Sequence, residues 1–400
     1  MEKINYSDYQ KTGDSDGERR VIVVKDLNNE KLISEIRNNA ATDTNSARIK
    51  RLLDLPDLSR KEGSPIKFII DKILDIPSFK DFDVIEIPEI VDVAKNFDLL
   101  NTPVDHPSRR TSDSYYADKN FVLRTHTTTM WPFYLKDPDV IEKLNETGCV
   151  KCLCHGKVFR KDEVDRKHFP VFHQIDGLYI CDKKIKIIGI PELSEVLADI
   201  AKNIYGPDVE YQILEDSFPF TDPSIQIEIK KGDSWIEILG AGVVHKKVLS
   251  NLGIDPEKYN GWAFGFGVER LAIAKMDIPD IRIFWSNDSR ITSQFKDINS
   301  KYKEVSKFPA TDRDISFIID KSVNLNNYYE IVRDFAENLI EEVKLLDKYE
   351  DKEKFGEDKI SYTFRITYRS IERTLTNEEI NKIQKKIRKK TERELSAKLR

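Results

Sequence analysis

The stretch GKVFRKDEVDRKHFPVFHQIDG, residues 156–177, decides how we interpret the rest of this chain. Residues 157–159 read as a strand that leads into Arg160, and a second strand starts near Pro170 after a charged segment. This pattern predicts two antiparallel strands joined by a long charged loop. An Arg beside aromatic, amide and carboxylate groups suits a nucleotide and an amine, because a guanidinium binds phosphate or carboxylate oxygens. The alternative is an exposed hairpin with a solvated loop.

The composition is that of a globular protein with much charge. Of 400 residues 39% are apolar and 34% charged, which allows two or three domains with a substantial core. No apolar run approaches the roughly 18–20 residues of a membrane span, so we expect no membrane association. The first twenty residues are rich in acids, unlike a transit peptide. We expect a cytoplasmic protein, with a mitochondrial or other organellar matrix as the alternative.

Charge is distributed unevenly along the chain. The last twenty residues carry nine basic and two acidic side chains, although the whole chain has a net charge of −5. A basic end on an acidic protein indicates a polyanionic partner at that end. The alternative is an amphipathic helix with a solvated face.

Four cysteines are present, and three of them stand close together in the sequence at Cys149, Cys152 and Cys154, just before His155. Such a cluster suggests zinc. Apolar residues interleave with it, however, and alternate residues of a strand point to opposite faces, so the four side chains cannot converge. We therefore expect reduced cysteines in a buried strand and no metal site.

Periodicity and turn residues predict the elements in order. We expect an N-terminal arm with one helix over residues 1–62, a first domain over 63–298 and a second over 299–400. Expected strands of the first domain cover 82–88, 122–131, 184–190, 209–214, 225–229 and 235–239, and expected helices cover 65–74, 138–144 and 191–205. In the second domain we expect strands at 315–319, 344–349, 360–368 and near the end, with helices at 328–342 and 377–394. That order is a split βαβ plan.

A glycine-flanked strand feeds a helix at GWAFGFGVER, which starts at Gly261 and ends at Arg270. Glycines let a ligand approach the backbone closely, and Arg270 would stand in the first turn of the helix. The alternative is a tight connection with a surface Arg.

Three of these stretches together resemble the motifs of class II aminoacyl-tRNA synthetases. FDVIEIPEI, which contains Pro88 and ends at Ile90, is similar to motif 1. The stretch quoted first resembles motif 2, with Arg160, and GFGVERLAI resembles motif 3, with Arg270. The resemblance implies an α+β fold in which helices flank an antiparallel sheet.

Longer strings narrow the resemblance to the phenylalanyl-tRNA synthetases. They are HPSR at His106, LRTHT at Leu123, FHQ at Phe172, FPFTDPS at Phe218, WIEILGAG at Trp235 and GWAFGFGVERLA at Gly261. SKFPATDRDISF at Ser306 and FRITYRSIERTLTNEE at Phe364 resemble that family's ferredoxin-fold anticodon-binding domain. The resemblance covers about residues 65–400, and both domains on one chain are similar to the single-chain, organellar type.

The resemblance also implies roles for individual residues. Those implied to bind ATP are Arg160, Phe172, His168, Arg270 and Glu237, with Arg160 and Arg270 catalytic through their charge. Those implied to bind phenylalanine are His126, Thr128, Gln174, Asp176, Phe218, Phe220 and Ala263. The family usually has Glu where this chain has Asp176, and commonly Ser where it has Thr128. The charged loop 161–168 is expected at the acceptor end of the tRNA.

Metal and tRNA contacts complete the expected site. ATP needs Mg²⁺, for which Glu237 and Glu228 on neighbouring strands are candidate ligands; pairing with Lys or Arg is the alternative. The basic residues expected to bind tRNA phosphates are Arg365, Arg369, Arg373, Lys386 and Lys390.

The function implied is ATP-dependent ligation of L-phenylalanine to tRNA(Phe). It would pass through an adenylate and end on the 2′-hydroxyl of the terminal adenosine, without an editing domain. The single-chain layout favours a monomer, although motif 1 builds a dimer in most class II enzymes. The rivals are activation of another amino acid on the same fold and a non-catalytic tRNA-binding protein.

Overall fold

The computed structural model describes residues 9–12, 19–305, 308–336 and 339–400. Within these residues one large mixed sheet carries most of the chain, in the order β1-β2-β3-β6-β7-β11-β10-β9-β8. From β6 to β8 all neighbours are antiparallel, whereas β3 joins β2 and β6 in parallel. The strands are β1 (Tyr9–Thr12), β2 (Val21–Val24), β3 (Asp83–Glu86), β6 (Cys149–Phe159), β7 (Val171–Asp182), β11 (Tyr259–Gly267), β10 (Ser234–Val244), β9 (Thr221–Lys231) and β8 (Tyr211–Phe218).

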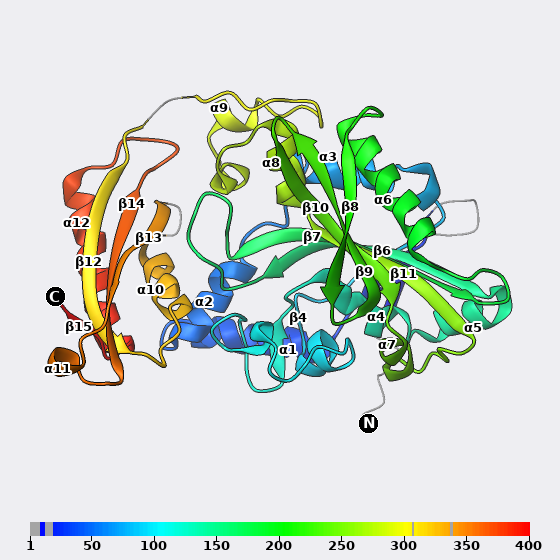
Figure 1. Ribbon diagram of the computed structural model, residues 1–400, viewed down its shortest axis with the longest axis horizontal. Helices are drawn as coiled ribbons and strands as arrows, with labels where there is room; N and C mark the ends of the chain where they lie inside the picture. Colours follow the sequence, from blue (N-terminus) through cyan, green and yellow to red (C-terminus); the bar gives the residue numbers. More distant parts are fainter. Residues whose placement is uncertain (1–8, 13–18, 306–307, 337–338) are drawn as a thin grey trace.

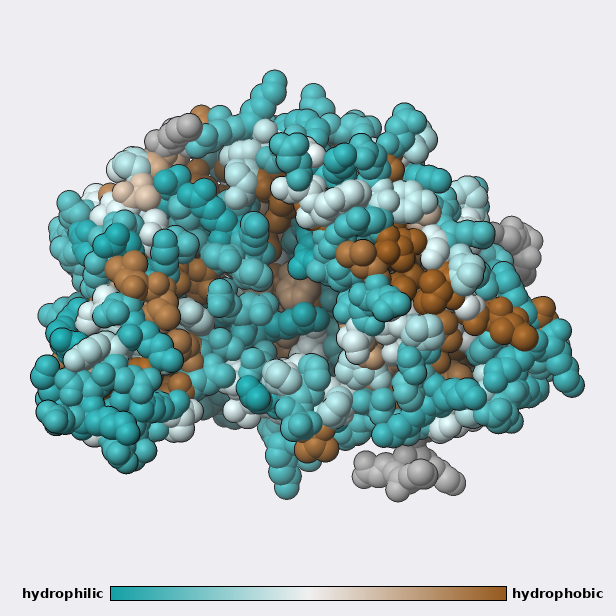
Figure 2. All heavy atoms as spheres, viewed as in Figure 1, coloured by the Kyte–Doolittle hydropathy of each residue, from teal (hydrophilic) through white to brown (hydrophobic). Residues whose placement is uncertain are grey.

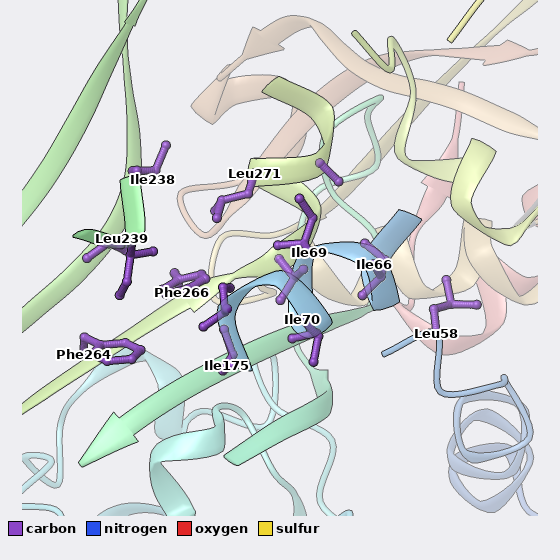
Figure 3. Close-up of a cluster of buried hydrophobic side chains, with 14 of the residues drawn as sticks. Leu58, Ile66, Ile69, Ile70, Ile175, Ile238, Leu239, Phe264, Phe266 and Leu271 are labelled. Carbon is purple, nitrogen blue, oxygen red and sulfur yellow. The ribbon is translucent and has the colours of Figure 1, made fainter. Parts of the chain in front are cut away.

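Helices α3, α6 and α8 pack on one face of this sheet, and α4, α5 and α7 pack against part of the other. In Figure 3 Ile66, Ile69 and Ile70 of α3 belong to one buried cluster with Phe264 and Phe266 of β11 and Leu271 of α8. Burying one such side chain stabilises the fold by about 1.5–3 kcal/mol. The helices of this part are α3 (Pro65–Leu74), α4 (Met130–Tyr134), α5 (Pro138–Thr147), α6 (Ile190–Tyr205), α7 (Lys246–Asn251), α8 (Val268–Met276) and α9 (Ser289–Thr292).

The predicted helices at 65–74, 138–144 and 191–205 are confirmed, because capping residues mark their ends. Ser64 accepts a hydrogen bond from the amide of Ile66, and Pro65 opens α3. Asp137 caps α5, which ends at Gly148 with φ of 76°.

The expectation of an N-terminal arm with one helix is wrong. Strand β2 joins the large sheet, and two helices follow, α1 (Leu27–Asn39) and α2 (Thr44–Leu53). Ile49 and Leu52 of α2 are fully buried in the main core, so this segment is part of the folded body. The rest of the expected arm, residues 1–8 and 13–18, lies outside the described residues.

Two predicted strands are also wrong. Over 122–131 the chain forms only β5 (Phe121–Leu123), paired with β4 (Ile90–Asp92), and then turns into a 3-10 segment at Thr127–Thr129 and into α4. Residues 184–190 form a turn that leads into α6, and the apolar side chains at 185 and 187 are exposed. Thus His126 and Thr128 are not delivered by alternation along a strand.

The described C-terminal part is a four-stranded antiparallel sheet in the order β13-β14-β12-β15, with two long helices and one short one. It follows the predicted split βαβ plan, except that the predicted helix 328–342 runs too far and β13 begins before residue 342. Residues 306–307 and 337–338 of the predicted segments lie outside the described chain. The elements are β12 (Thr311–Asp320), α10 (Asn326–Ala336), β13 (Ile340–Tyr349), α11 (Lys352–Phe355), β14 (Lys359–Tyr368), α12 (Asn377–Glu394) and β15 (Lys398–Leu399).

The two sheets form two lobes joined through α2 and through the β6–β7 loop, which reaches toward the C-terminal sheet in Figure 1. Asp334 of α10 pairs with Arg48 at 2.6 Å and Arg51 at 3.1 Å, both from α2. The amide of Val343 donates to the carbonyl of Val164 in the loop at 2.9 Å. Figure 2 shows a mostly hydrophilic face that is hollowed between the lobes. Among the described residues, no helix has the length and apolar character to cross a membrane.

Candidate active site

The strand register places the predicted ligand groups on one face of the large sheet. Asp176 faces Gly265 and Gln174 faces Gly267 across β7 and β11, and Gly265 in turn faces Gly240 of β10. Directly paired residues share a face, and so do alternate residues along one strand. By the same register this face also carries Phe172, Leu178, Ala263, Gly242, Gln226, Glu228 and Glu237. The predicted site residues of these strands therefore lie on the face of the sheet opposite α3 and α8.

Asp176 is the best-defined group on this face. It is 3% exposed and accepts hydrogen bonds from the hydroxyls of Thr127, at 2.6 Å, and Thr128, at 2.5 Å. The amide of Thr127 donates to the side-chain oxygen of Gln174 at 3.2 Å. The structure thus brings the predicted Thr128, Gln174 and Asp176 together. It adds Thr127, whose side chain would point to the opposite face from Thr128 if residues 122–131 formed the predicted strand.

Burial raises the pKa of Asp176 to about 6, although the two threonine hydroxyls and Arg160 act in the opposite direction. A buried carboxylate is stabilised by a cation that approaches it. Asp176 can therefore bind an ammonium group at neutral pH.

Aromatic rings stand beside this polar group. The His126 ring lies 5.9 Å from Phe220, which makes an edge contact with Trp131 at 6.0 Å and stacks on Phe218 at 6.0 Å. Phe218 ends β8 and Phe220 lies in the turn before β9, so the two rings come from different local structures. Trp131 joins this aromatic group and was not predicted.

Two nitrogens in this aromatic group are fully buried. Nδ1 of His126 and Nε1 of Trp131 have no hydrogen-bond partner among the described residues. Burial, and then the charge of Arg160, lower the pKa of His126 to about 3, so the ring is neutral. Buried polar atoms without partners are uncommon in native proteins and point to a binding role here.

Two glycines, Gly240 on β10 and Gly265 on β11, leave the sheet surface in this region without side chains; we call this surface the glycine floor. A Cβ on Gly265 would stand 2.6 Å from a carboxylate oxygen of Asp176, and one on Gly240 would stand 2.5 Å from the Phe218 ring. Because Gly240 and Gly265 face each other across β10 and β11, the floor between Asp176 and Phe218 has no side chain. Ala263, two residues before Gly265, provides the smallest side chain next to this floor.

Arg160 and Phe172 lie together at the end of the hairpin. The Arg160 guanidinium stands 5.2 Å from the centre of the Phe172 ring, and its Nε donates to the carbonyl of Thr125 at 2.9 Å. Burial lowers the pKa of Arg160, but a guanidinium with so high a starting pKa remains charged. A fixed cation and a half-buried ring are thus adjacent, as the sequence predicted.

Arg270 and the two predicted metal ligands form a second polar group. Arg270 pairs with Glu237 at 3.0 Å, and Glu237 faces Glu228 across β9 and β10. Glu228 accepts hydrogen bonds from Gln212 and Gln226. In the described chain no cluster of three or more His, Cys, Asp or Glu side chains could hold a metal by itself. Mg²⁺ that arrives with ATP is bound by one or two carboxylates, and the role of Glu237 and Glu228 as its ligands stays a prediction.

Glu269 connects the two motifs and was not predicted. Its buried carboxylate accepts hydrogen bonds from the amide of His173, at 2.9 Å and 3.0 Å, and lies 2.6 Å from His173 Nδ1. His173 Nε2 accepts from the amide of Leu58 at 2.9 Å, so Nδ1 carries the proton. Glu269 precedes Arg270, and His173 follows Phe172, so this pair sets the position of α8 relative to β7.

The charged loop between β6 and β7 does not stand free. Arg333 of α10 donates to the carbonyls of Asp162 and Glu163, and Arg166 pairs with Glu341 of β13. His168 lies away from this contact and pairs with Asp165 at 2.8 Å, which raises the pKa of His168. The expected contact of this loop with tRNA stays a prediction.

Most of the residues expected to bind tRNA are paired within the chain. Arg365 pairs with Asp314, Arg369 with Glu341, Arg373 with Glu379 and Lys390 with Asp334. Lys386, on an exposed position of α12, has no such ion pair in the described chain. Arg369 and Lys390 thus lie at the junction of the two lobes.

Two family models match the chain, and together with the fold and site they define a class II aminoacyl-tRNA synthetase. The class II core domain of tRNA synthetases (F) matches residues 53–295, and the ferredoxin-fold anticodon binding domain matches residues 306–400. The antiparallel sheet with its Arg160 and Arg270 belongs to the first, and the four-stranded sheet to the second.

Curated relatives define the family within that class. The chloroplastic/mitochondrial phenylalanine–tRNA ligase of Arabidopsis thaliana is 37% identical over 359 residues, which cover 86% of this chain and 80% of the relative. The mitochondrial phenylalanine–tRNA ligase of Mus musculus is 34% identical over 77% of this chain and 72% of its own length. An alpha subunit of phenylalanine–tRNA ligase from Caldicellulosiruptor saccharolyticus is 40% identical, but over only 54% of this chain and 63% of its own length. The chain belongs to the phenylalanine–tRNA ligases of the single-chain type.

Proposed function

We propose that this enzyme ligates L-phenylalanine to tRNA(Phe) through a phenylalanyl-adenylate. One observation carries the proposal: a buried carboxylate, a group of aromatic rings beside two facing glycines and a fixed guanidinium lie on one face of the sheet. An amino acid with an aromatic side chain has the ammonium, ring and carboxylate that these three features would bind.

The amino-acid half of the site is the region from Asp176 to Phe218. Asp176 binds the ammonium group, while the hydroxyls of Thr127 and Thr128 hold the carboxylate of Asp176 in place. The phenyl ring lies against Phe218 and Phe220, and each aromatic pair contributes about 0.5–1.5 kcal/mol beyond area burial. His126 and Gln174 contact the polar end of the substrate. Ala263 limits the space beyond the ring, so that a tyrosine hydroxyl is crowded and left unpaired.

The nucleotide half of the site is the region from Phe172 to Arg270. Adenine stacks on Phe172, and the adjacent guanidinium of Arg160, anchored on the carbonyl of Thr125, stabilises the charge that develops on the α-phosphate as the substrate carboxylate attacks. Arg270 exchanges Glu237 for the γ-phosphate, and His168 contacts the nucleotide from the loop. Glu237 and Glu228 would hold the Mg²⁺ that ATP brings, and the ion would neutralise phosphate charge there. Catalysis is by positioning and electrostatics, with no protein nucleophile.

The second step transfers the phenylalanyl group to the 2′-hydroxyl of the terminal adenosine. The C-terminal domain binds the tRNA phosphates through Lys386 and through four basic residues that exchange their carboxylate partners for phosphates: Arg365, Arg369, Arg373 and Lys390. A tRNA ending in 2′-deoxyadenosine should not be charged, whereas one ending in 3′-deoxyadenosine should be.

We further propose that one chain is the working unit, that it lacks editing, and that it serves an organelle. Relatives that span most of the chain are organellar by name, whereas the matching alpha subunits cover only about half of it. These names favour the organellar alternative over the cytoplasmic expectation. Sizing the active protein tests the first point, and hydrolysis of added tyrosyl-tRNA(Phe) would contradict the second.

The catalytic assignment is tested by ATP–pyrophosphate exchange with an Arg160→Ala variant. Exchange should fall by about a hundredfold or more, because an electrostatic contact to the transition state contributes about 3 kcal/mol. Arg290→Ala is the matched control, since that arginine is exposed and pairs only with Asp288 among the described residues. Full exchange activity in Arg160→Ala would contradict the assignment.

A further inference from the structure

Two cysteines face each other at the end of the β6–β7 hairpin that is farther from the active site. Cys149 and Cys181 are direct partners in the register of the two strands, and their Sγ atoms lie 2.9 Å apart. Neither residue takes part in the aminoacylation site described above. The pair is far from it: Cys181 follows Asp176 by five residues, or about 17 Å along an extended strand.

The backbone geometry at this pair suits a covalent bond between the sulfurs. The amide of Asp182 donates to the carbonyl of Gly148 at 2.7 Å, so Gly148 and Asp182 form a hydrogen-bonded pair. Antiparallel strands alternate hydrogen-bonded with non-hydrogen-bonded pairs, so Cys149 and Cys181 are of the second kind, with Cα atoms about 4.5 Å apart. A disulfide accepts Cα separations of about 4.4–6.8 Å.

Exposure distinguishes Cys149 from the other three cysteines. Cys149 is partly exposed, and the hydroxyl of Tyr179 donates to its sulfur at 3.4 Å. Cys152, Cys154 and Cys181 are fully buried, and burial raises the pKa of Cys154 to about 12 and that of Cys181 to about 11. Thiols that are buried as neutral groups react slowly with oxidants. An oxidant in solution therefore reaches Cys149 first.

We propose that Cys149 and Cys181 are a reversible redox modification site that a peroxide converts to a cross-strand disulfide. The Cys149 thiolate attacks one peroxide oxygen, the O–O bond breaks, and a sulfenic acid and water form. The Cys181 sulfur then attacks the Cys149 sulfur, the S–O bond breaks, and a second water leaves. Overall, two thiols and one peroxide give a disulfide and two waters. A small thiol such as glutathione reverses the bond by exchange.

The disulfide would fasten the end of the hairpin that carries motif 2. It closes a loop that runs from Cys149 through β6, the charged loop and β7 to Cys181. Such a cross-link stabilises a protein mainly by restricting the unfolded chain. The oxidised protein should therefore unfold at a higher temperature. Its phenylalanine-dependent exchange rate should stay within about twofold of the reduced protein, because the strand already holds this register.

The test treats the full-length protein with a small excess of hydrogen peroxide and measures its intact mass and its peptides. The expected results are a loss of about 2 Da, a peptide linking Cys149 to Cys181, and return of the lost mass with dithiothreitol. Cys152→Ser should still form the bond, whereas Cys181→Ser should leave a sulfenic acid on Cys149 that dimedone traps. A linkage to Cys152 or Cys154, or oxidation of Cys149 in the wild type that stops at sulfinic acid, would overturn the proposal. The wild-type mass decides the matter even if a variant fails to fold.

Discussion

At the scale of single residues, the protonation state of Asp176 determines the net charge of the proposed amino-acid site. Its carboxylate is buried, and the hydroxyls of Thr127 and Thr128 already donate to it. Burial has the largest effect and raises its pKa to about 6. The free enzyme therefore loses this negative charge at a pH at which an exposed aspartate keeps it.

The pH dependence of substrate binding follows from that shift. Above pH 6 the carboxylate is charged and binds the substrate ammonium, and below pH 6 it is increasingly protonated. We expect KM for phenylalanine to rise by about tenfold for each pH unit below that point, while KM for ATP changes less. Exchange measured from pH 5 to 8 checks this, and a flat KM for phenylalanine across pH 6 would contradict it.

Asp176 has a smaller side chain than the Glu usual in the family, and Thr128 has a larger one than the usual Ser. Asp is one methylene shorter than Glu, and Thr is one methyl larger than Ser, while the Thr128 hydroxyl lies 2.5 Å from Asp176. We expect the two changes to compensate. In a double-mutant cycle, Asp176→Glu alone should raise KM for phenylalanine by about tenfold or more, since overpacking a buried site costs about 1–3 kcal/mol.

The double variant Asp176→Glu with Thr128→Ser should recover most of that loss. Asp216→Asn, an exposed aspartate on β8, is the control that should change nothing. Additive effects of the two substitutions would show that they act independently.

At the scale of elements, the contact between β7 and α8 positions the proposed nucleotide site. Glu269 on α8 accepts from the amide and lies against Nδ1 of His173 on β7, and both side chains are buried. Arg270 and Phe172 are the neighbours of this pair in sequence. A shift of α8 along β7 would therefore move the γ-phosphate contact away from the adenine contact.

Glu269→Gln tests this coupling of elements. The amide of Gln would face a donor on His173, which costs about 1–3 kcal/mol in a buried site. We expect KM for ATP to rise by about tenfold with KM for phenylalanine nearly unchanged, and Glu269→Asp to recover part of the effect. Glu195→Gln, exposed on α6, is the control. Equal losses for both substrates would point to general destabilisation instead.

The elements also show what periodicity alone can predict. The helix at 377–394 is found as predicted, because a capping box of Thr376 and Glu379 marks its start. The segment 122–131 has the β-branched residues of a strand, but in the fold the hydroxyls of Thr127 and Thr128 bind Asp176, almost fifty residues away in sequence. Residues 184–190 alternate like a strand, but they form no strand, and Ile185 and Ile187 are exposed.

The same limit applies to the site. Arg160, Phe172, Gln174 and Asp176 could be predicted together because they lie on one hairpin and resemble motif 2. Trp131 and Glu269 could not, since an aromatic or acidic residue in a helix carries no sign of its distant partner. A glutamate directly before the motif 3 arginine was the available signal for Glu269.

At the scale of the whole molecule, Asp334 holds the two lobes together. Arg48, Arg51 and Lys390 converge on this one carboxylate, which is 8% exposed, and the hydrogen bond from Arg48 and the surrounding cations lower its pKa. Its partner Arg48 is 286 residues away in sequence. No local pattern predicts such a contact.

Asp334→Asn tests this junction. Removing one partner leaves three cations with a neutral amide, and breaking a buried ion pair costs about 3–5 kcal/mol. We expect a lower Tm and a larger radius of gyration in X-ray scattering, most clearly at low salt, with phenylalanine-dependent exchange retained. Asp320→Asn is the matched control, because Asp320 is exposed and receives hydrogen bonds only from Ser322 in the described chain. An unchanged radius with an unchanged Tm would contradict the role of Asp334.

The most direct test of the central claim is ATP–pyrophosphate exchange by the purified chain with each of the twenty amino acids in turn. The carboxylate, rings and glycine floor predict that phenylalanine alone stimulates exchange strongly, with tyrosine weaker by about a hundredfold or more because its hydroxyl is left unpaired. Addition of tRNA(Phe) should then give phenylalanyl-tRNA. Exchange that no amino acid stimulates, or that another amino acid stimulates more than phenylalanine does, would contradict the account.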